Sequence, residues 1–180
     1  MSVPAGAASC LRLAATGSAA GCARRHVRHL LRWWRLDHVA HLAELVAGEL
    51  VLAGTPASGY AVGDVGYQAL VGVGWVTLWV ELQPGQLLVE TWDRDASPPR
   101  ITCPGDSGAP GLYFVPMLAD RWNYYTPSTG GKITWCELRI PPAGERPLPH
   151  RRPTAIVRRS AMTTFDSVLL RRVRDRLVDY

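Results

Sequence analysis

The sequence predicts an α+β fold, a two-layer α/β sandwich in which helices cover one face of a mostly antiparallel sheet. Two amphipathic helical segments follow each other early in the chain, at residues 23–35 and 37–53. Two strand-like runs, residues 75–82 and 87–92, then flank a Pro-Gly turn and indicate a β-hairpin. The predicted order is strand, helix, helix, loop, strand, strand, helix, strand and a further helix, which is typical of helices segregated onto one face of a mostly antiparallel sheet.

The length of 180 residues fits one domain, or one domain with an appendage. A hydrophobic fraction of 47% in 180 residues is enough to bury a sizeable core, and no apolar run approaches the roughly 18 residues of a membrane span. The N-terminus has Arg12 as its only early charge and no continuous apolar stretch, so we do not expect a secretory signal. The cysteines lack CxxC spacing and a metal-ligand pattern with histidine. We therefore expect reduced, mostly buried thiols in a cytoplasmic protein at Cys10, Cys22, Cys103 and Cys136.

Arginine dominates the basic residues. The formal net charge is +5, and nineteen of the twenty lysine and arginine residues are arginine, with clusters at residues 24–35 and 146–176. A basic face attracts acidic partners, including nucleic acid. A stacking platform would need aromatic residues interleaved with these arginines, so we favour solvated helix faces and expect no nucleic-acid partner.

The N-terminal part of the chain predicts an edge strand followed by a helix. Residues 10–14, CLRLA, alternate as a short strand would. In the helix at 23–35, an apolar stripe runs from Val27 to Trp34, and arginines occupy the other faces. Four histidines lie on or beside the two helices, and we expect them at the surface. Metal binding by His38 and His41 would need a third ligand that the sequence does not indicate.

The helix at 37–53, DHVAHLAELVAGELVLA, is the segment around which the other predictions are arranged. Apolar residues recur along it at steps of three and four, Asp37 can cap its first turn, and Gly54 ends it. Glu49 lies on this apolar face, one step from Ala53. A buried carboxylate needs a partner or a chemical role, whereas a glutamate at the margin of the stripe reaches water. Periodicity alone leaves both interpretations open.

The rest of the chain alternates between loops and short elements. We expect a long loop at 54–74, a helix at 111–122, a turn region at 123–131 and a strand at 132–140. Asp93 stands where the second hairpin strand ends.

This pattern divides the chain into three parts. The main domain covers residues 10–140, and residues 141–163 are rich in proline and arginine and are typical of a linker. Residues 164–180 are predicted to form a C-terminal amphipathic helix.

Four segments together resemble a known family. They are ARRHVRHLLRWWRLD, AELVAGELVLA, LLVETWDRDASPP, and GLYFVPMLADRW followed by GGKITWCEL. In this order and spacing, residues 10–140 resemble the GHKL (Bergerat-fold, histidine kinase-like) ATPase superfamily, and within it the small anti-sigma regulatory serine kinases. The resemblance implies a Bergerat-type ATP-binding fold.

The resemblance implies roles for two carboxylates. In the family, a helix with the pattern ELVxNA carries a general-base glutamate, and the asparagine four residues later binds the Mg²⁺ that bridges the ATP phosphates. Glu49 stands at the glutamate position and Ala53 at the asparagine position, so the metal ligand is missing. Asp93 stands where the family has an aspartate that ends a central strand and accepts a hydrogen bond from the adenine amino group.

The resemblance also implies a phosphate-binding turn, usually GxGL, that opens a helix. Backbone N–H groups in such a turn hold anionic oxygens. Here the turn reads Ala109-Pro110-Gly111-Leu112, so Gly111 and Leu112 match, Ala109 replaces the first glycine, and Pro110 has no N–H. We therefore expect weak binding of ATP or ADP without Mg²⁺, and weak or lost kinase activity.

Two functions follow from these matches and departures. The first is an ATP-binding transcription regulator of the anti-sigma factor or serine/threonine kinase type, which binds a sigma factor or an anti-anti-sigma-type antagonist protein. The second is a protein-interaction module, a pseudo-kinase that binds no nucleotide. Relatives of this fold commonly dimerise, so a homodimer is a further expectation that no residue of this sequence specifies.

Overall fold

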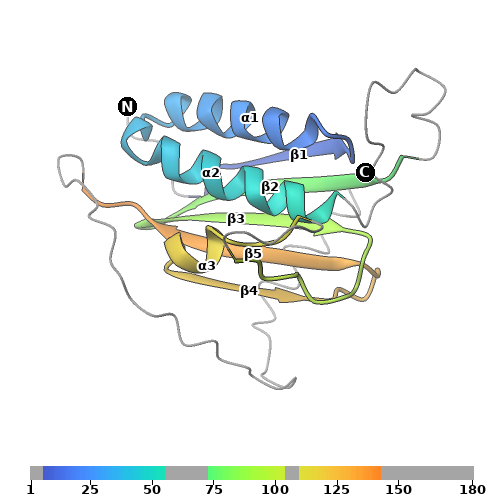
Figure 1. Cartoon of the computed structure of the whole chain (residues 1–180). Helices are drawn as coiled ribbons and strands as arrows, with labels where there is room; N and C mark the ends of the chain where they lie inside the picture. Colours follow the sequence, from blue (N-terminus) through green and yellow to red (C-terminus); the bar gives the residue numbers. More distant parts are fainter. Residues whose placement is uncertain (1–5, 56–72, 104–109, 143–180) are drawn as a thin grey trace.

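The computed structural model describes residues 6–55, 73–103 and 110–142 (Figure 1). Its elements, in chain order, are β1 (Ala8–Ala14), α1 (Ala19–Trp33), α2 (Asp37–Gly54), β2 (Trp75–Gln83), β3 (Gln86–Asp93), α3 (Val115–Leu118), β4 (Arg121–Tyr125) and β5 (Lys132–Arg139). Most of the predicted loop at 54–74, the predicted linker and the predicted C-terminal helix lie outside the described residues.

The described strands form one five-stranded sheet with the order β1-β2-β3-β5-β4, and every neighbouring pair is antiparallel. Helices α1, α2 and α3 lie on the same side of this sheet (Figure 1). The predicted α+β class, a two-layer sandwich, is therefore confirmed. The predicted edge strand is also found at the edge, as β1.

The core lies between the helices and the sheet. Helix α1 packs along α2, and α2 packs on β2 and β3. Alternation within the strands sends every second side chain toward the helices, so that Leu78 and Val80 of β2 and Val89 of β3 are fully buried there. These contacts hold α2 over the sheet, where the carboxylate of Glu49 accepts hydrogen bonds from the backbone that enters α3.

The predicted helix at 111–122 is wrong for most of its length. Only the four residues of α3 are helical, and Leu112 instead forms an isolated parallel bridge with Ile101. The backbone becomes extended at Ala119, with ψ of 142°, and leads directly into β4. Strand β4 was predicted as helix and turn, but its five residues pair with β5. A ladder of backbone hydrogen bonds with β5 outweighs the weak helical spacing around Pro116.

The expectation that the cysteines are mostly buried is also wrong. Cys10, Cys22 and Cys103 are exposed, and only Cys136 is buried. Cys10 lies on an edge strand and Cys22 on the outward side of α1, so neither position faces the core. Cys22 and Cys136 are free thiols.

None of the helices in the described part of the chain has the length and apolar character that crossing a bilayer requires.

Candidate functional site

Glu49 lies in the C-terminal half of α2, and its carboxylate is turned inward. Only 7% of the residue is exposed, so the interpretation of a carboxylate that reaches water does not hold. Oε1 accepts hydrogen bonds from the backbone N–H groups of Tyr113 and Phe114, both at 2.8 Å, and Oε2 accepts one from Val115 at 2.7 Å. These N–H groups precede or open α3, where a helix has no carbonyl partners of its own.

The three bonds give Glu49 a structural role in this conformation. Hydrogen bonds from N–H groups to an ionised carboxylate are stronger than those between neutral groups. They join α2 to the segment that enters α3, which lies more than sixty residues further along the chain. A general base needs its acceptor oxygen turned toward a substrate, whereas both oxygens of Glu49 are turned toward backbone N–H groups.

Gly111 and Leu112, the predicted phosphate-binding residues, lie directly before this segment. The Leu112 N–H donates to the carbonyl oxygen of Arg100 at 2.8 Å, and the Leu112 carbonyl accepts from Thr102 at 3.0 Å. The side chain of Leu112 is fully buried in the core. A Cβ at Gly111 would lie 2.6 Å from the Arg100 carbonyl oxygen, so close packing accounts for glycine at this position.

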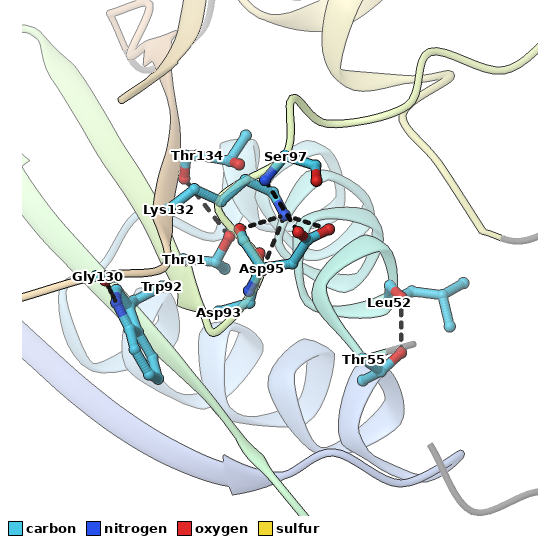
Figure 2. Close-up of polar contacts among 10 residues, drawn as sticks. All are labelled: Leu52, Thr55, Thr91, Trp92, Asp93, Asp95, Ser97, Gly130, Lys132 and Thr134. Carbon is cyan, nitrogen blue, oxygen red and sulfur yellow. Dashed lines mark hydrogen bonds and ion pairs between the residues drawn. The ribbon is translucent and has the colours of Figure 1, made fainter. Parts of the chain in front are cut away.

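Asp93 is the last residue of β3 and is only 1% exposed. Its Oδ1 accepts a hydrogen bond from the Lys132 ammonium at 2.8 Å and another from the Asp95 backbone N–H at 3.0 Å. Lys132 is 4% exposed and also donates to the Asp95 carbonyl at 3.1 Å, so the lysine joins the end of β3 to the loop that follows it (Figure 2).

Burial raises the pKa of Asp93 above its ordinary value, and the hydrogen bond and charge of Lys132 offset part of that rise. Sequence reasoning missed Lys132, although it is the only lysine in the chain and opens a strand. Its position opposite Asp93 follows from the register of β3 and β5. That register becomes known only when the two strands are paired.

Two glycines lie against Asp93. A Cβ at Gly54, the last residue of α2, would lie 3.1 Å from the Asp93 Cβ and 3.2 Å from its Oδ2. A Cβ at Gly131 would collide with the Asp93 carbonyl oxygen, and Gly131 also has a φ of +73° that favours glycine. The structure therefore brings Asp93 to the C-terminal end of α2, the helix that carries Glu49.

The described residues contain no group of three or more His, Cys, Asp or Glu side chains that could hold a metal ion. Ala53 has no oxygen in its side chain to offer a cation. His38 Nε2 instead makes a hydrogen bond with the carbonyl oxygen of Pro141 at 3.1 Å.

A scan against protein-family models finds no match, and a search of curated proteins finds no similar sequence. The resemblance to the GHKL superfamily therefore stays a prediction.

We expect Glu49→Gln to lower the free energy of unfolding by about 1–3 kcal/mol, because the amide nitrogen of glutamine cannot accept from a backbone N–H. Urea denaturation at pH 7 measures the change. The control is Glu44→Gln, since Glu44 is equally buried but its partner Arg28 has a side chain that is 53% exposed. The control should lose less than about 1 kcal/mol. Equal losses in the two variants would contradict the role of the three N–H bonds.

We expect Lys132→Met to lower the free energy of unfolding at pH 7 by about 3–5 kcal/mol, because it leaves the Asp93 carboxylate buried without its cation. Removing the lysine also raises the pKa of Asp93 further above 3.8 in the folded state. The folded state then holds the proton more tightly than the unfolded chain, so the contribution of Asp93 to stability is greatest below pH 3.8 and falls as the pH rises through the folded-state pKa.

The measurement for this prediction is urea denaturation of both proteins between pH 5 and 8. The deficit of Lys132→Met relative to the unsubstituted protein should shrink at the acidic end. The double variant Asp93→Asn, Lys132→Met should remove the pH-dependent part of the deficit. A deficit that stays constant with pH in the single variant would show that Asp93 is not the group responsible.

Proposed function

We propose that this protein is a cytoplasmic regulator of the GHKL anti-sigma factor type, in which kinase activity is weak or lost. In this proposal Asp93 accepts a hydrogen bond from the adenine of ATP or ADP. The observation that carries it is the buried Asp93 carboxylate, which stands at the end of a central strand and against the glycine that ends α2.

The geometry of Asp93 is compatible with an adenine contact. The bonds from Lys132 and Asp95 both go to Oδ1, whereas Oδ2 faces the position where Gly54 lacks a side chain. The amino group of adenine is a hydrogen-bond donor, and a carboxylate oxygen is its natural acceptor. Recognition of the base in this way requires no metal ion.

The described residues do not fit a bound triphosphate with Mg²⁺. Ala53 has no oxygen ligand, Pro110 has no N–H, and the Leu112 N–H donates to Arg100. The next three N–H groups donate to Glu49. Phosphoryl transfer depends on N–H donors and a metal to stabilise charge. Because these N–H groups already have acceptors within the protein, they support the proposal that phosphotransfer is inefficient.

We further propose that the protein acts by binding a sigma factor or an anti-anti-sigma-type antagonist. Support comes from α1, whose outward face carries exposed arginines that suit an acidic partner, among them Arg24, Arg25 and Arg32. The alternative is a protein-interaction module that binds no nucleotide. The ion pair between Lys132 and Asp93 favours this alternative, because the lysine already satisfies one oxygen of the carboxylate.

Nucleotide titration by calorimetry tests the adenine contact. We expect ATP and ADP to bind with and without Mg²⁺, and we expect inosine triphosphate to bind at least about tenfold more weakly, because its ring carries a carbonyl where adenine has the amino donor. Asp93→Asn should abolish binding. Asp120→Asn is the control, since Asp120 is an exposed carboxylate paired with Arg139.

Unchanged affinity in Asp93→Asn, or equal affinity for ATP and inosine triphosphate, would overturn the assignment of Asp93. If neither ATP nor ADP binds, the alternative function is supported.

We expect Ala53→Asn to leave phosphotransfer unrestored. The asparagine supplies the missing oxygen, but Pro110 still lacks an N–H and Glu49 still holds three others. Transfer of labelled phosphate from ATP to candidate antagonist proteins is the measurement. Robust transfer by this single variant would show that the phosphate site is intact.

A further inference from the structure

Lys132 is the first residue of β5 and lies opposite Asp93 in the register of β3 and β5. Directly paired residues of an antiparallel sheet project to the same face, so both side chains lie on the side of the sheet where Gly54 of α2 approaches Asp93. The side chain of Lys132 is 5% exposed and that of Asp93 is 2% exposed. Burying an ammonium group is costly unless it is paired and hydrogen-bonded, so the position of Lys132 depends on Asp93.

The contacts of Lys132 distinguish the two oxygens of the Asp93 carboxylate (Figure 2). The ammonium group donates to Oδ1 at 2.8 Å and to the Asp95 carbonyl oxygen at 3.1 Å. The Asp95 backbone N–H donates to the same Oδ1 at 3.0 Å. Oδ2 accepts no hydrogen bond from the described residues and lies beside the position where Gly54 lacks a Cβ. The pairing with Lys132 therefore fixes which oxygen of Asp93 is left for a further donor.

The protonation state of Asp93 decides what Oδ2 can bind. An ionised carboxylate only accepts hydrogen bonds, whereas a protonated carboxyl group also donates one. Burial raises the pKa of Asp93 and favours the protonated form. The hydrogen bond and the positive charge of Lys132 lower the pKa and favour the ionised form. Lys132 thus acts against burial at this carboxylate.

Few other charged groups face Asp93 within the part of the chain that the structure describes. The carboxylate of Asp95, in the loop after β3, raises the pKa of Asp93, whereas the Asp95 backbone N–H lowers it. Gly54 and Thr55, at the end of α2, have no side chain that titrates in the neutral range. Lys132 is therefore the one cation of the described residues that favours the ionised form of Asp93.

We propose that Lys132 is the positioning residue that sets the base selectivity of the Asp93 site, because it keeps the carboxylate ionised, occupies Oδ1 and leaves Oδ2 as an acceptor for the amino group of adenine. This inference rests on the proposed function, in which Asp93 contacts the base of ATP or ADP. Hypoxanthine carries a carbonyl oxygen where adenine has the amino group, and two acceptors do not form a hydrogen bond. A protonated Asp93 would donate to that carbonyl, so loss of the Lys132 cation shifts the selectivity toward hypoxanthine.

Calorimetric titration with ATP and with inosine triphosphate between pH 5.5 and 8 tests this role. The readout is the ratio of the two dissociation constants, in which effects on the shared triphosphate cancel. In the unsubstituted protein the ratio should favour ATP at least about tenfold at pH 8 and should fall as the pH is lowered through the folded-state pKa of Asp93. Lys132→Met raises that pKa, so the fall should occur at higher pH, and the ratio at pH 7 should be at least about threefold smaller.

Two further variants separate the charge of Lys132 from its contribution to folding. Lys132→Arg keeps a cation opposite Asp93 and should keep the ratio within about twofold of that of the unsubstituted protein. Arg121→Met is the matched control, since it removes a cation from the Glu137 carboxylate near the other end of β5 and should leave the ratio unchanged. A purely structural role of Lys132 would weaken the binding of both nucleotides equally and would not change the ratio.

A second measurement uses the unsubstituted protein and so does not depend on the folding of Lys132→Met. Lys132 is the only lysine in the chain, so isotope-labelled lysine gives a single side-chain ammonium signal in NMR. Its chemical shift should change as Asp93 is protonated, and Asp93→Asn should remove this change. The pH midpoint of the change should agree with the midpoint at which selectivity for ATP falls.

The outcomes distinguish this inference from the proposed function on which it rests. Selective binding of ATP by Lys132→Met with an unchanged pH profile would overturn the role of Lys132 and leave the adenine contact in place. Disagreement between the two midpoints in the unsubstituted protein would do the same. If the unsubstituted protein binds neither ATP nor inosine triphosphate, the proposed function itself is overturned, and the inference with it.

Discussion

The Glu49 carboxylate accepts three backbone N–H bonds at 2.7–2.8 Å and so connects helix α2 with the chain that enters α3. Without this acceptor, the N–H groups of Tyr113, Phe114 and Val115 would need other partners in a place that is partly buried. The same bonds stabilise the Glu49 carboxylate, because a buried carboxylate is stable only when donors surround it. The position of α3, and the path from α3 into β4, therefore depend on one side chain of α2.

The carboxylate of Asp93 is likewise stabilised by hydrogen-bond donors from within the chain. Lys132 supplies its cation within the chain, and Asp95 supplies a backbone donor. In the proposed function the two oxygens of this carboxylate have different partners. Oδ1 accepts the bonds that hold the loop after β3, and Oδ2 accepts a hydrogen bond from the nucleotide. In the same proposal, the three N–H groups that donate to Glu49 are not available to a phosphate, so the proposed site recognises a base and does not transfer a phosphate efficiently.

The fold was largely predictable because its main signals are local. Amphipathic spacing locates α1 and α2, and alternation around a Pro-Gly turn locates β2 and β3. Strand β4 was missed because the sequence RWNYY follows an apolar run with helical spacing, and only pairing with β5 decides between the two. The partners of Glu49 were not predictable in the same way. They are backbone groups some sixty-five residues away, and no side-chain pattern marks a backbone N–H as a ligand.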